Sequence, residues 1–207
     1  MYQKMKLKYG YEDLEPVIDS KTVNIHYNKH YQKYLDNLNK VLQELNYDFR
    51  YSVIELINHI DEFPIQKRDN ILFNAGGVIN HELYFNSMTP LINERPVGEL
   101  KKAIDETYGN YENFKQEFIK TASYLVGSGY TFLVLNKENE LEIINTSNQE
   151  TPYLYGLTPI LALDLWEHAF YLKYQNRKDE YINNFFSIID FENVNKLYGQ
   201  KKEVQKK

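Results

Sequence analysis

The first chemically suggestive pattern is a set of histidine and tyrosine side chains near the start of the chain. His26 and His30 are four residues apart, and Tyr34 follows at the same interval. In a helix these three side chains lie along one face. A histidine pair at this spacing can hold a metal ion, but it also occurs in ordinary packing and on protein surfaces.

A second candidate is His81, which follows two adjacent glycines, Gly76 and Gly77, in an otherwise helical segment. Glycine in a helix interior costs about 1 kcal/mol relative to alanine. The pair therefore indicates that another backbone or a cluster of bulky groups approaches closely. Packing between two helices is the alternative explanation.

The third candidate is a carboxylate at the end of an apolar segment. Asp164 ends the apolar residues 159–164, and His168 follows four residues later. Burial of a carboxylate is costly unless it is paired or coordinated, although Asp164 can also cap the helix that follows. Together the three regions supply three imidazoles and one carboxylate, a set suited to manganese or iron.

Other kinds of metal or redox site fit poorly. No glutamate precedes a histidine by three residues, as di-iron bundles require, and no second histidine completes a zinc-protease motif after His81-Glu82. Cysteine is absent, which excludes disulfides, iron–sulfur clusters and thiol nucleophiles. His59 has no partner motif, and we interpret it as a packing or surface residue.

The composition is that of an ordinary globular protein. The 207 residues carry a net charge of −5, which disfavours a nucleic-acid partner. The longest apolar segments fall short of the ~20 residues of a membrane helix, so we expect no membrane partner. Residues 1–11 lack the pattern of a signal peptide, and we expect a cytoplasmic protein.

The elements that must position the candidate residues follow from hydrophobic spacing. Helices are predicted, with Asp19-Ser20 as the first cap, over 20–45, 52–60, 66–88, 98–122 with an interruption at 108–110, 166–174, 179–189 and 191–198. Strands are predicted over 130–135, 141–144 and 159–164. The charged residues 199–207 are expected to lack regular structure.

These patterns predict an α+β fold. An N-terminal antiparallel helical hairpin domain over 1–92 precedes a C-terminal α/β domain over 93–207, which contains a three-stranded antiparallel sheet. Proline, glycine and charged residues at 93–98 form the predicted linker between them.

The motifs around the candidate residues resemble the iron/manganese superoxide dismutase family over nearly the whole chain. The matching segments are 13–16, 25–39, 73–81, 127–129, 148–149 and, most specifically, Asp164-Leu165-Trp166-Glu167-His168-Ala169-Phe170-Tyr171-Leu172. The resemblance implies the conversion of superoxide to dioxygen and hydrogen peroxide by redox cycling of one manganese or iron ion per subunit. It also implies a role in antioxidant defence and assembly as a homodimer or tetramer.

The resemblance assigns the metal ligands residue by residue. It implies that His26, His81, Asp164 and His168 bind the metal, with a solvent molecule as the fifth ligand. Such a site leaves positive charge on the metal, which attracts an anionic substrate.

Further residues match positions around the metal in the family. Tyr34 and Gln149 resemble the phenol and the amide that hydrogen-bond near the bound solvent, and His30 resembles a histidine at the substrate channel. We expect these three to act in catalysis.

Three more residues match the family's subunit interface and metal surroundings. Trp166 is expected to pack as an apolar wall beside the metal. Glu167 and Tyr171 resemble residues that reach across a two-fold interface to the partner subunit.

Manganese is favoured over iron by the place of the glutamine. Manganese-type members carry it where this chain has Gln149, and iron-type members carry it where this chain has Gly77. Ala162 stands where manganese-preferring members usually have glycine, so iron remains open.

The chain departs from the family where tryptophan is common, with Tyr130, Phe132 and Phe85 in its place. Tyr130 is expected to add a hydroxyl near Gln149 and Tyr34. A basic group at the substrate channel is expected from Lys29, Arg177 or Lys178. A catalytically silent family member, acting as a structural or interaction subunit, is the alternative function.

Overall fold

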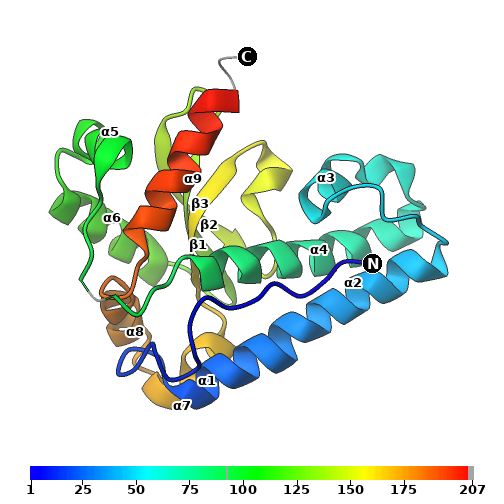
Figure 1. Ribbon diagram of the computed structural model, residues 1–207, viewed down its shortest axis with the longest axis horizontal. Coiled ribbons are helices and arrows are strands. Elements are labelled where there is room, and N and C mark those ends of the chain that lie inside the picture. Colours follow the sequence, from blue (N-terminus) through cyan, green and yellow to red (C-terminus); the bar gives the residue numbers. More distant parts are fainter. Residues whose placement is uncertain (92, 205–207) are drawn as a thin grey trace.

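Two long antiparallel helical segments form the first half of the chain, as Figure 1 shows. The first consists of α1 (Ser20–Ile25), the π-helix η1 (His26–Tyr31) and α2 (Gln32–Glu44); α3 (Val53–Asn58) and η2 (Ile60–Glu62) connect it to α4 (Ile65–Asn86). The computed structural model describes residues 1–91 and 93–204. The predicted domain boundary after residue 92 therefore adjoins a position outside the described residues.

Local capping explains where the helices of the hairpin begin. The Asp19 side chain accepts a hydrogen bond from the backbone N–H of Thr22 at the start of α1. Ser52 and Glu55 form a reciprocal capping box at the start of α3. Because α2 buries Leu35, Leu38 and Leu42 while packing along α4, the hairpin has its own apolar interior.

The second half of the chain contains shorter helices around a sheet. Its elements are α5 (Gly98–Tyr108), α6 (Tyr111–Ser123), β1 (Gly129–Leu135), β2 (Leu141–Ser147), η3 (Pro152–Tyr155), β3 (Thr158–Asp164), η4 (Glu167–Ala169), α7 (Tyr171–Tyr174), α8 (Lys178–Phe185) and α9 (Phe191–Val204). Among the described residues, no helix is long and apolar enough to cross a membrane.

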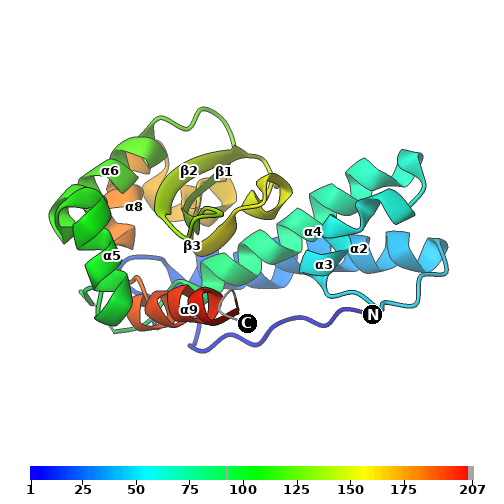
Figure 2. The same ribbon diagram turned by 90° about the horizontal axis from the view of Figure 1, so that it is seen from above.

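The three strands form an antiparallel sheet in the order β2-β1-β3. The central strand β1 is buried along its whole length. Helix α6 packs against β1 and β2, and α4 packs against β3. Figure 2 shows the hairpin extending from one side of the sheet, with α5, α6 and α8 on the other. The α+β fold and its three-stranded sheet are as predicted.

The structure differs from the predicted elements at several places; α8 ends at Phe185 rather than 189, and β2 continues to Ser147 rather than 144. The first helix is widened at η1, because its backbone there bonds in the π pattern. The predicted helix 166–174 is divided into η4 and α7, since Phe170 takes an extended φ of −141°. Helix α9 continues past residue 198 to Val204, and residues 205–207 lie outside the described part.

Candidate metal centre

Four side chains from separate elements converge on one point in the interior. They are His26 at the start of η1, His81 in α4, Asp164 at the end of β3 and His168 in η4. One donor atom from each lies within 4.8 Å of the others. We call these four residues the donor group.

Asp164 lies at the centre of the donor group. Its Oδ2 atom is 3.2 Å from His26 Nε2 and 3.3 Å from His168 Nε2. The distance from the same oxygen to His81 Nε2 is 3.9 Å. His26, His81 and Asp164 are buried, and His168 is 11% exposed, so water has little access.

The ring of His81 is held so that one nitrogen faces the centre. His81 Nδ1 lies 2.6 Å from the carbonyl oxygen of Gly77, which can only accept a hydrogen bond. Nδ1 therefore carries the proton and Nε2 offers a lone pair. His81 Nε2 and His26 Nε2 have no hydrogen-bond partner among the described residues, although both are buried.

The protonation states of the donor group suit metal binding. Burial lowers the pKa of His26 to about 4 and the pKa of His81 well below its usual value. Burial by itself raises the pKa of Asp164, but the neighbouring His168 and His26 outweigh it and the pKa is lowered. Near neutral pH the carboxylate is ionised and the buried imidazoles are neutral, as metal ligands must be.

A metal ion fits this arrangement chemically. Unpartnered lone pairs on buried nitrogens are costly unless an electron-pair acceptor lies between them. Three imidazoles and one carboxylate form a mixed nitrogen and oxygen set that suits borderline first-row metals. The donor group can therefore hold one such ion.

The two glycines before His81 each have a specific neighbour. A Cβ atom on Gly76 would lie 2.0 Å from the carbonyl oxygen of Gln149, and one on Gly77 would lie 2.5 Å from the ring of Tyr34. The close approach that the sequence indicated is thus made by a backbone at one glycine and by an aromatic ring at the other. No larger residue fits at either position without displacing its neighbour.

Gln149 and Tyr34 meet beside the donor group. Gln149 Nε2 donates a hydrogen bond to the Tyr34 hydroxyl at 3.1 Å, and the Tyr34 ring lies 5.2 Å from the His81 ring. Gln149 Oε1 is buried without a hydrogen-bond partner among the described residues. Burial raises the pKa of Tyr34, partly opposed by the bond from Gln149, so the phenol keeps its proton at neutral pH.

Tyr130 reaches the donor group because of the sheet register. It is the direct partner of Asp164 across β1 and β3. Its hydroxyl lies 3.4 Å from His81 Nδ1, and its side chain is fully buried. Burial, followed by the charge of Asp164, raises the pKa of Tyr130 well above its usual value.

Aromatic rings enclose the rest of the centre. His30 and Trp166 each stack on His168, with ring centroids 4.2 and 5.5 Å from its ring. The Phe85 ring lies 5.0 Å from that of His26. Phe132 stacks on Tyr130 at 5.7 Å, one layer further out.

Glu167 and Tyr171 lie next to the centre in sequence but face solvent. Glu167 is exposed, and Tyr171 is 48% exposed. Both residues are predicted to contact a partner subunit, and in the single chain their side chains face solvent.

The basic residues named from the sequence have other partners or lie at the surface. Arg177 forms an ion pair with Glu180 at 2.8 Å, and Lys178 donates to the carbonyl oxygen of Leu125. Lys29 is exposed. Lys33, which sequence reasoning missed, lowers the pKa of His30 through its charge, after burial and His168.

Sequence reasoning also missed three polar side chains near the donor group. Asn80 Nδ2 donates to the carbonyl oxygens of Gln149 and Glu150. Tyr84 and Tyr181 form a buried pair that ends on the backbone of Asp164. Asn80 directly precedes His81 within the matching segment 73–81, and this was the signal for it in the sequence.

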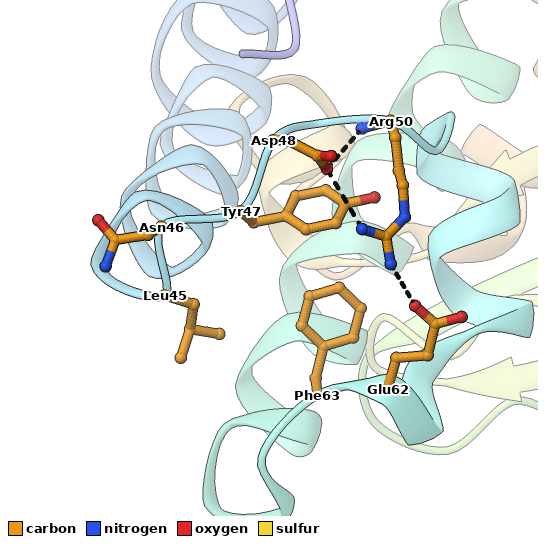
Figure 3. Close-up of a pocket in the computed structure, with 7 residues that line it drawn as sticks. All are labelled: Leu45, Asn46, Tyr47, Asp48, Arg50, Glu62 and Phe63. Carbon is orange, nitrogen blue, oxygen red and sulfur yellow. Dashed lines mark hydrogen bonds and ion pairs between the residues drawn. The ribbon is translucent and has the colours of Figure 1, made fainter.

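His59 is exposed at the surface, and its Nδ1 lies 3.2 Å from Oε1 of Glu62, which lines a pocket at the turn after α2. Figure 3 shows Arg50 in this pocket between Asp48 and Glu62, and the Arg50–Glu62 ion pair measures 2.6 Å. His59 stacks on Tyr51 with ring centroids 4.1 Å apart. The charged side chains of this pocket form ion pairs with one another. Among the described residues, the group of histidine and carboxylate side chains that could hold a metal ion is the donor group.

Comparison with known proteins agrees with the geometry. Residues 1–89 match the family "iron/manganese superoxide dismutases, alpha-hairpin domain", and residues 96–197 match "iron/manganese superoxide dismutases, C-terminal domain". A manganese superoxide dismutase of Pseudomonas aeruginosa is 42% identical over 194 residues, covering 94% of this chain and 95% of the relative.

Two further relatives are similar over the same range. A manganese superoxide dismutase of Listeria monocytogenes is 39% identical over 97% of this chain and 99% of its own length. One from Leptolyngbya boryana is 39% identical over 94% of this chain and 79% of its own length.

Proposed function

The chain belongs to the iron/manganese superoxide dismutase family and is a superoxide dismutase, and we propose that His26, His81, Asp164 and His168 hold its metal. The enzyme converts two superoxide ions and two protons to dioxygen and hydrogen peroxide, with one manganese or iron ion per subunit. The observation that carries the site assignment is the convergence of four donor atoms within 4.8 Å. The comparisons give no support to a catalytically silent subunit.

When bound, the metal would supply the one-electron redox chemistry that the conversion of superoxide requires. The donor group carries a single negative charge, on Asp164, so a trivalent or divalent cation leaves the site positive and attracts an anion. Burial strengthens this attraction because the surroundings have a low effective dielectric constant.

Tyr34 and Gln149 are proposed to assist the protonation that forms hydrogen peroxide. The Tyr34 oxygen accepts a hydrogen bond from Gln149, so its own hydrogen is free to point at another acceptor. The raised pKa keeps that hydrogen in place at neutral pH. Tyr34 can thus donate a hydrogen bond to a peroxide that is forming beside the donor group.

His30 is proposed to border the substrate path, since it is only partly buried and stacks on His168. Trp166 also stacks on the His168 ring, and it donates through Nε1 to the carbonyl oxygen of Asn148. Tyr130 is proposed to tune the site through its hydroxyl beside His81.

Manganese is the proposed metal, and an enzyme that is active with iron is the alternative. The named relatives are manganese enzymes. In addition, the Tyr34 ring occupies the space in which a side chain on Gly77 would begin, and the amide that bonds to Tyr34 belongs to Gln149. This is the arrangement that favoured manganese from the sequence.

Reconstitution tests the function and the metal together. Metal-free protein is loaded separately with manganese and with iron, and bound metal and superoxide consumption are measured. We expect one ion per subunit with either metal and higher activity with manganese. Stoichiometric metal without activity would support the silent-subunit alternative, and no bound metal would overturn the site.

A homodimer, or a tetramer built from it, is proposed through the face that carries Glu167 and Tyr171. Tyr171 and its neighbour in the chain, Leu172, are both about half exposed, at 48% and 50%. Adjacent exposed apolar side chains favour a contact with another protein surface over permanent exposure to water. Light scattering of the wild type and a Tyr171→Glu variant tests this, because the variant should dissociate to monomers.

The division into domains over 1–92 and 93–207 is likewise a proposal, which the two matched family regions support. The cytoplasmic location stays a prediction, and cell fractionation tests it.

A further inference from the structure

Two buried tyrosines form a hydrogen-bonded series that ends on a residue of the donor group. The hydroxyl oxygens of Tyr84, on α4, and Tyr181, on α8, are 3.1 Å apart. The Tyr181 hydroxyl donates to the backbone carbonyl oxygen of Asp164 at 3.0 Å. Tyr84 is 1% exposed and Tyr181 is fully buried, so water does not compete for these bonds.

Each tyrosine has a single hydroxyl hydrogen, and this fixes which group donates and which accepts along the series. A carbonyl oxygen can only accept, so the single hydroxyl hydrogen of Tyr181 is used on Asp164. Tyr84 must then donate to the oxygen of Tyr181. Burial raises the pKa of both phenols above the usual value, so neither hydrogen is lost at neutral pH.

The series connects parts of the donor group that come from different regions of the fold. The Tyr84 ring lies 5.2 Å from the ring of His26, which belongs to the hairpin. Asp164 ends β3, in the second half of the chain. Tyr84 and Tyr181 therefore form a continuous set of contacts from one ligand candidate of the hairpin to one of the sheet.

Asp164 is held at two atoms besides the one that faces the imidazoles. Its Oδ1 accepts a hydrogen bond from the backbone N–H of Trp166 at 2.8 Å, and its carbonyl oxygen accepts from Tyr181. With the backbone and one carboxylate oxygen both occupied, Oδ2 is left to point at the three histidines.

We propose that Tyr84 and Tyr181 are positioning residues, which set Asp164 against His26 so that the four donor atoms converge before the metal enters. This inference rests on the proposed function of the donor group as the metal site. Residues that orient ligands in this way typically change metal affinity by 10- to 100-fold when they are removed.

Another buried tyrosine, Tyr174, provides a control for the loss of a buried hydrogen bond that does not involve the donor group. Tyr174 is also buried, and its hydroxyl donates to the backbone carbonyl oxygen of Val17 at 2.6 Å. Tyr174→Phe removes a bond of the same kind from the interior, but the carbonyl that it leaves unpaired does not belong to the donor group.

The experiment compares Tyr181→Phe, Tyr84→Phe and Tyr174→Phe with the wild type, each loaded with manganese. The readouts are the rate of manganese loss to a chelator, the visible absorption of the bound metal and the thermal midpoint. Tyr181→Phe should lose manganese about tenfold faster and shift the absorption band. Tyr84→Phe should act in the same direction by about threefold, because Tyr181 keeps its bond to Asp164.

Tyr174→Phe should lower the thermal midpoint and leave metal loss and absorption unchanged. The inference is overturned if Tyr181→Phe loses manganese no faster than Tyr174→Phe. If Tyr181→Phe does not fold, a wild-type rate of loss in Tyr84→Phe overturns it. Wild-type protein that binds no metal would instead overturn the proposed function, and the inference with it.

Discussion

Replacement of Gly76 by alanine should separate the activity of this enzyme from its stability. Gly76 lies in α4, and a Cβ atom there would be 2.0 Å from the carbonyl oxygen of Gln149. That oxygen must move about 1.4 Å to reach the 3.4 Å at which ordinary contact begins. Asn80, one turn further along α4, holds the same carbonyl by a hydrogen bond of 3.2 Å, so the segment cannot withdraw freely.

The effect of Gly76→Ala on stability is the difference of two opposing contributions. Alanine favours the helix by about 1 kcal/mol over glycine, whereas overpacking of a filled interior costs about 1–3 kcal/mol. The net change should lie between neutral and a loss of about 2 kcal/mol. For a chain of this size that is a fall of at most about 8 °C in the thermal midpoint.

The effect of Gly76→Ala on activity should be much larger. Gln149 bonds to Tyr34 beside the donor group, and a displacement of about 1 Å in a positioned group can reduce the rate by about 100-fold. We therefore expect superoxide consumption per bound metal to fall about 100-fold, measured by stopped-flow spectroscopy on manganese-loaded protein.

The control is Gly199→Ala in α9, because no atom lies within 4 Å of the Cβ position there. This variant should gain about 1 kcal/mol of stability and keep wild-type activity. A Gly76→Ala variant with wild-type activity per bound metal and a raised thermal midpoint would refute the reasoning.

Three further predictions concern the surroundings of the metal, acid stability and salt. Tyr130→Phe removes the hydroxyl beside His81 without changing the ring. The reduction midpoint of the bound metal should therefore shift in a redox titration. An unchanged midpoint, together with an unchanged dependence of activity on pH, would count against tuning by Tyr130. The buried His26, with its pKa lowered to about 4 from 6.5, stabilises the metal-free fold above pH 6.5, and this contribution of about 3 kcal/mol should be lost as the pH falls to about 4. Urea unfolding of metal-free protein checks this, and equal stability at pH 7 and pH 4 would contradict it. The rate of superoxide consumption should fall as salt rises from about 0.01 to 0.1 M, because the screening length shortens from about 30 to about 10 Å. Lys33→Gln should make this rate less dependent on salt, since Lys33 places a positive charge near His30. A wild-type rate independent of salt would argue against local attraction of superoxide.

Local signals in the sequence were sufficient for most of the fold. The cap at Asp19 and the period of apolar residues predicted the helices of the hairpin within a few residues. The strands were found because β1 and β3 are apolar along their length. The π-turn at η1 and the break at Phe170 were missed, since both depend on backbone bonding that side-chain patterns do not encode.

The sequence by itself determined which atoms are available for chemistry. Without cysteine, only nitrogen and oxygen donors remain, and the order of the motifs carrying His26, His81, Asp164 and His168 identified the family. These are properties of residue type and of spacing along the chain, and they can be read before any contact is known.

Only the tertiary structure decided how those atoms are held. It showed that Gly76 admits a backbone carbonyl and Gly77 an aromatic ring, and that the register of β1 and β3 brings Tyr130 opposite Asp164. It also brought Tyr84 and Tyr181, 97 residues apart in the sequence, into one hydrogen-bonded series. Such contacts are set by how separate elements pack, and the free energy of packing depends on surfaces that meet only in the folded chain.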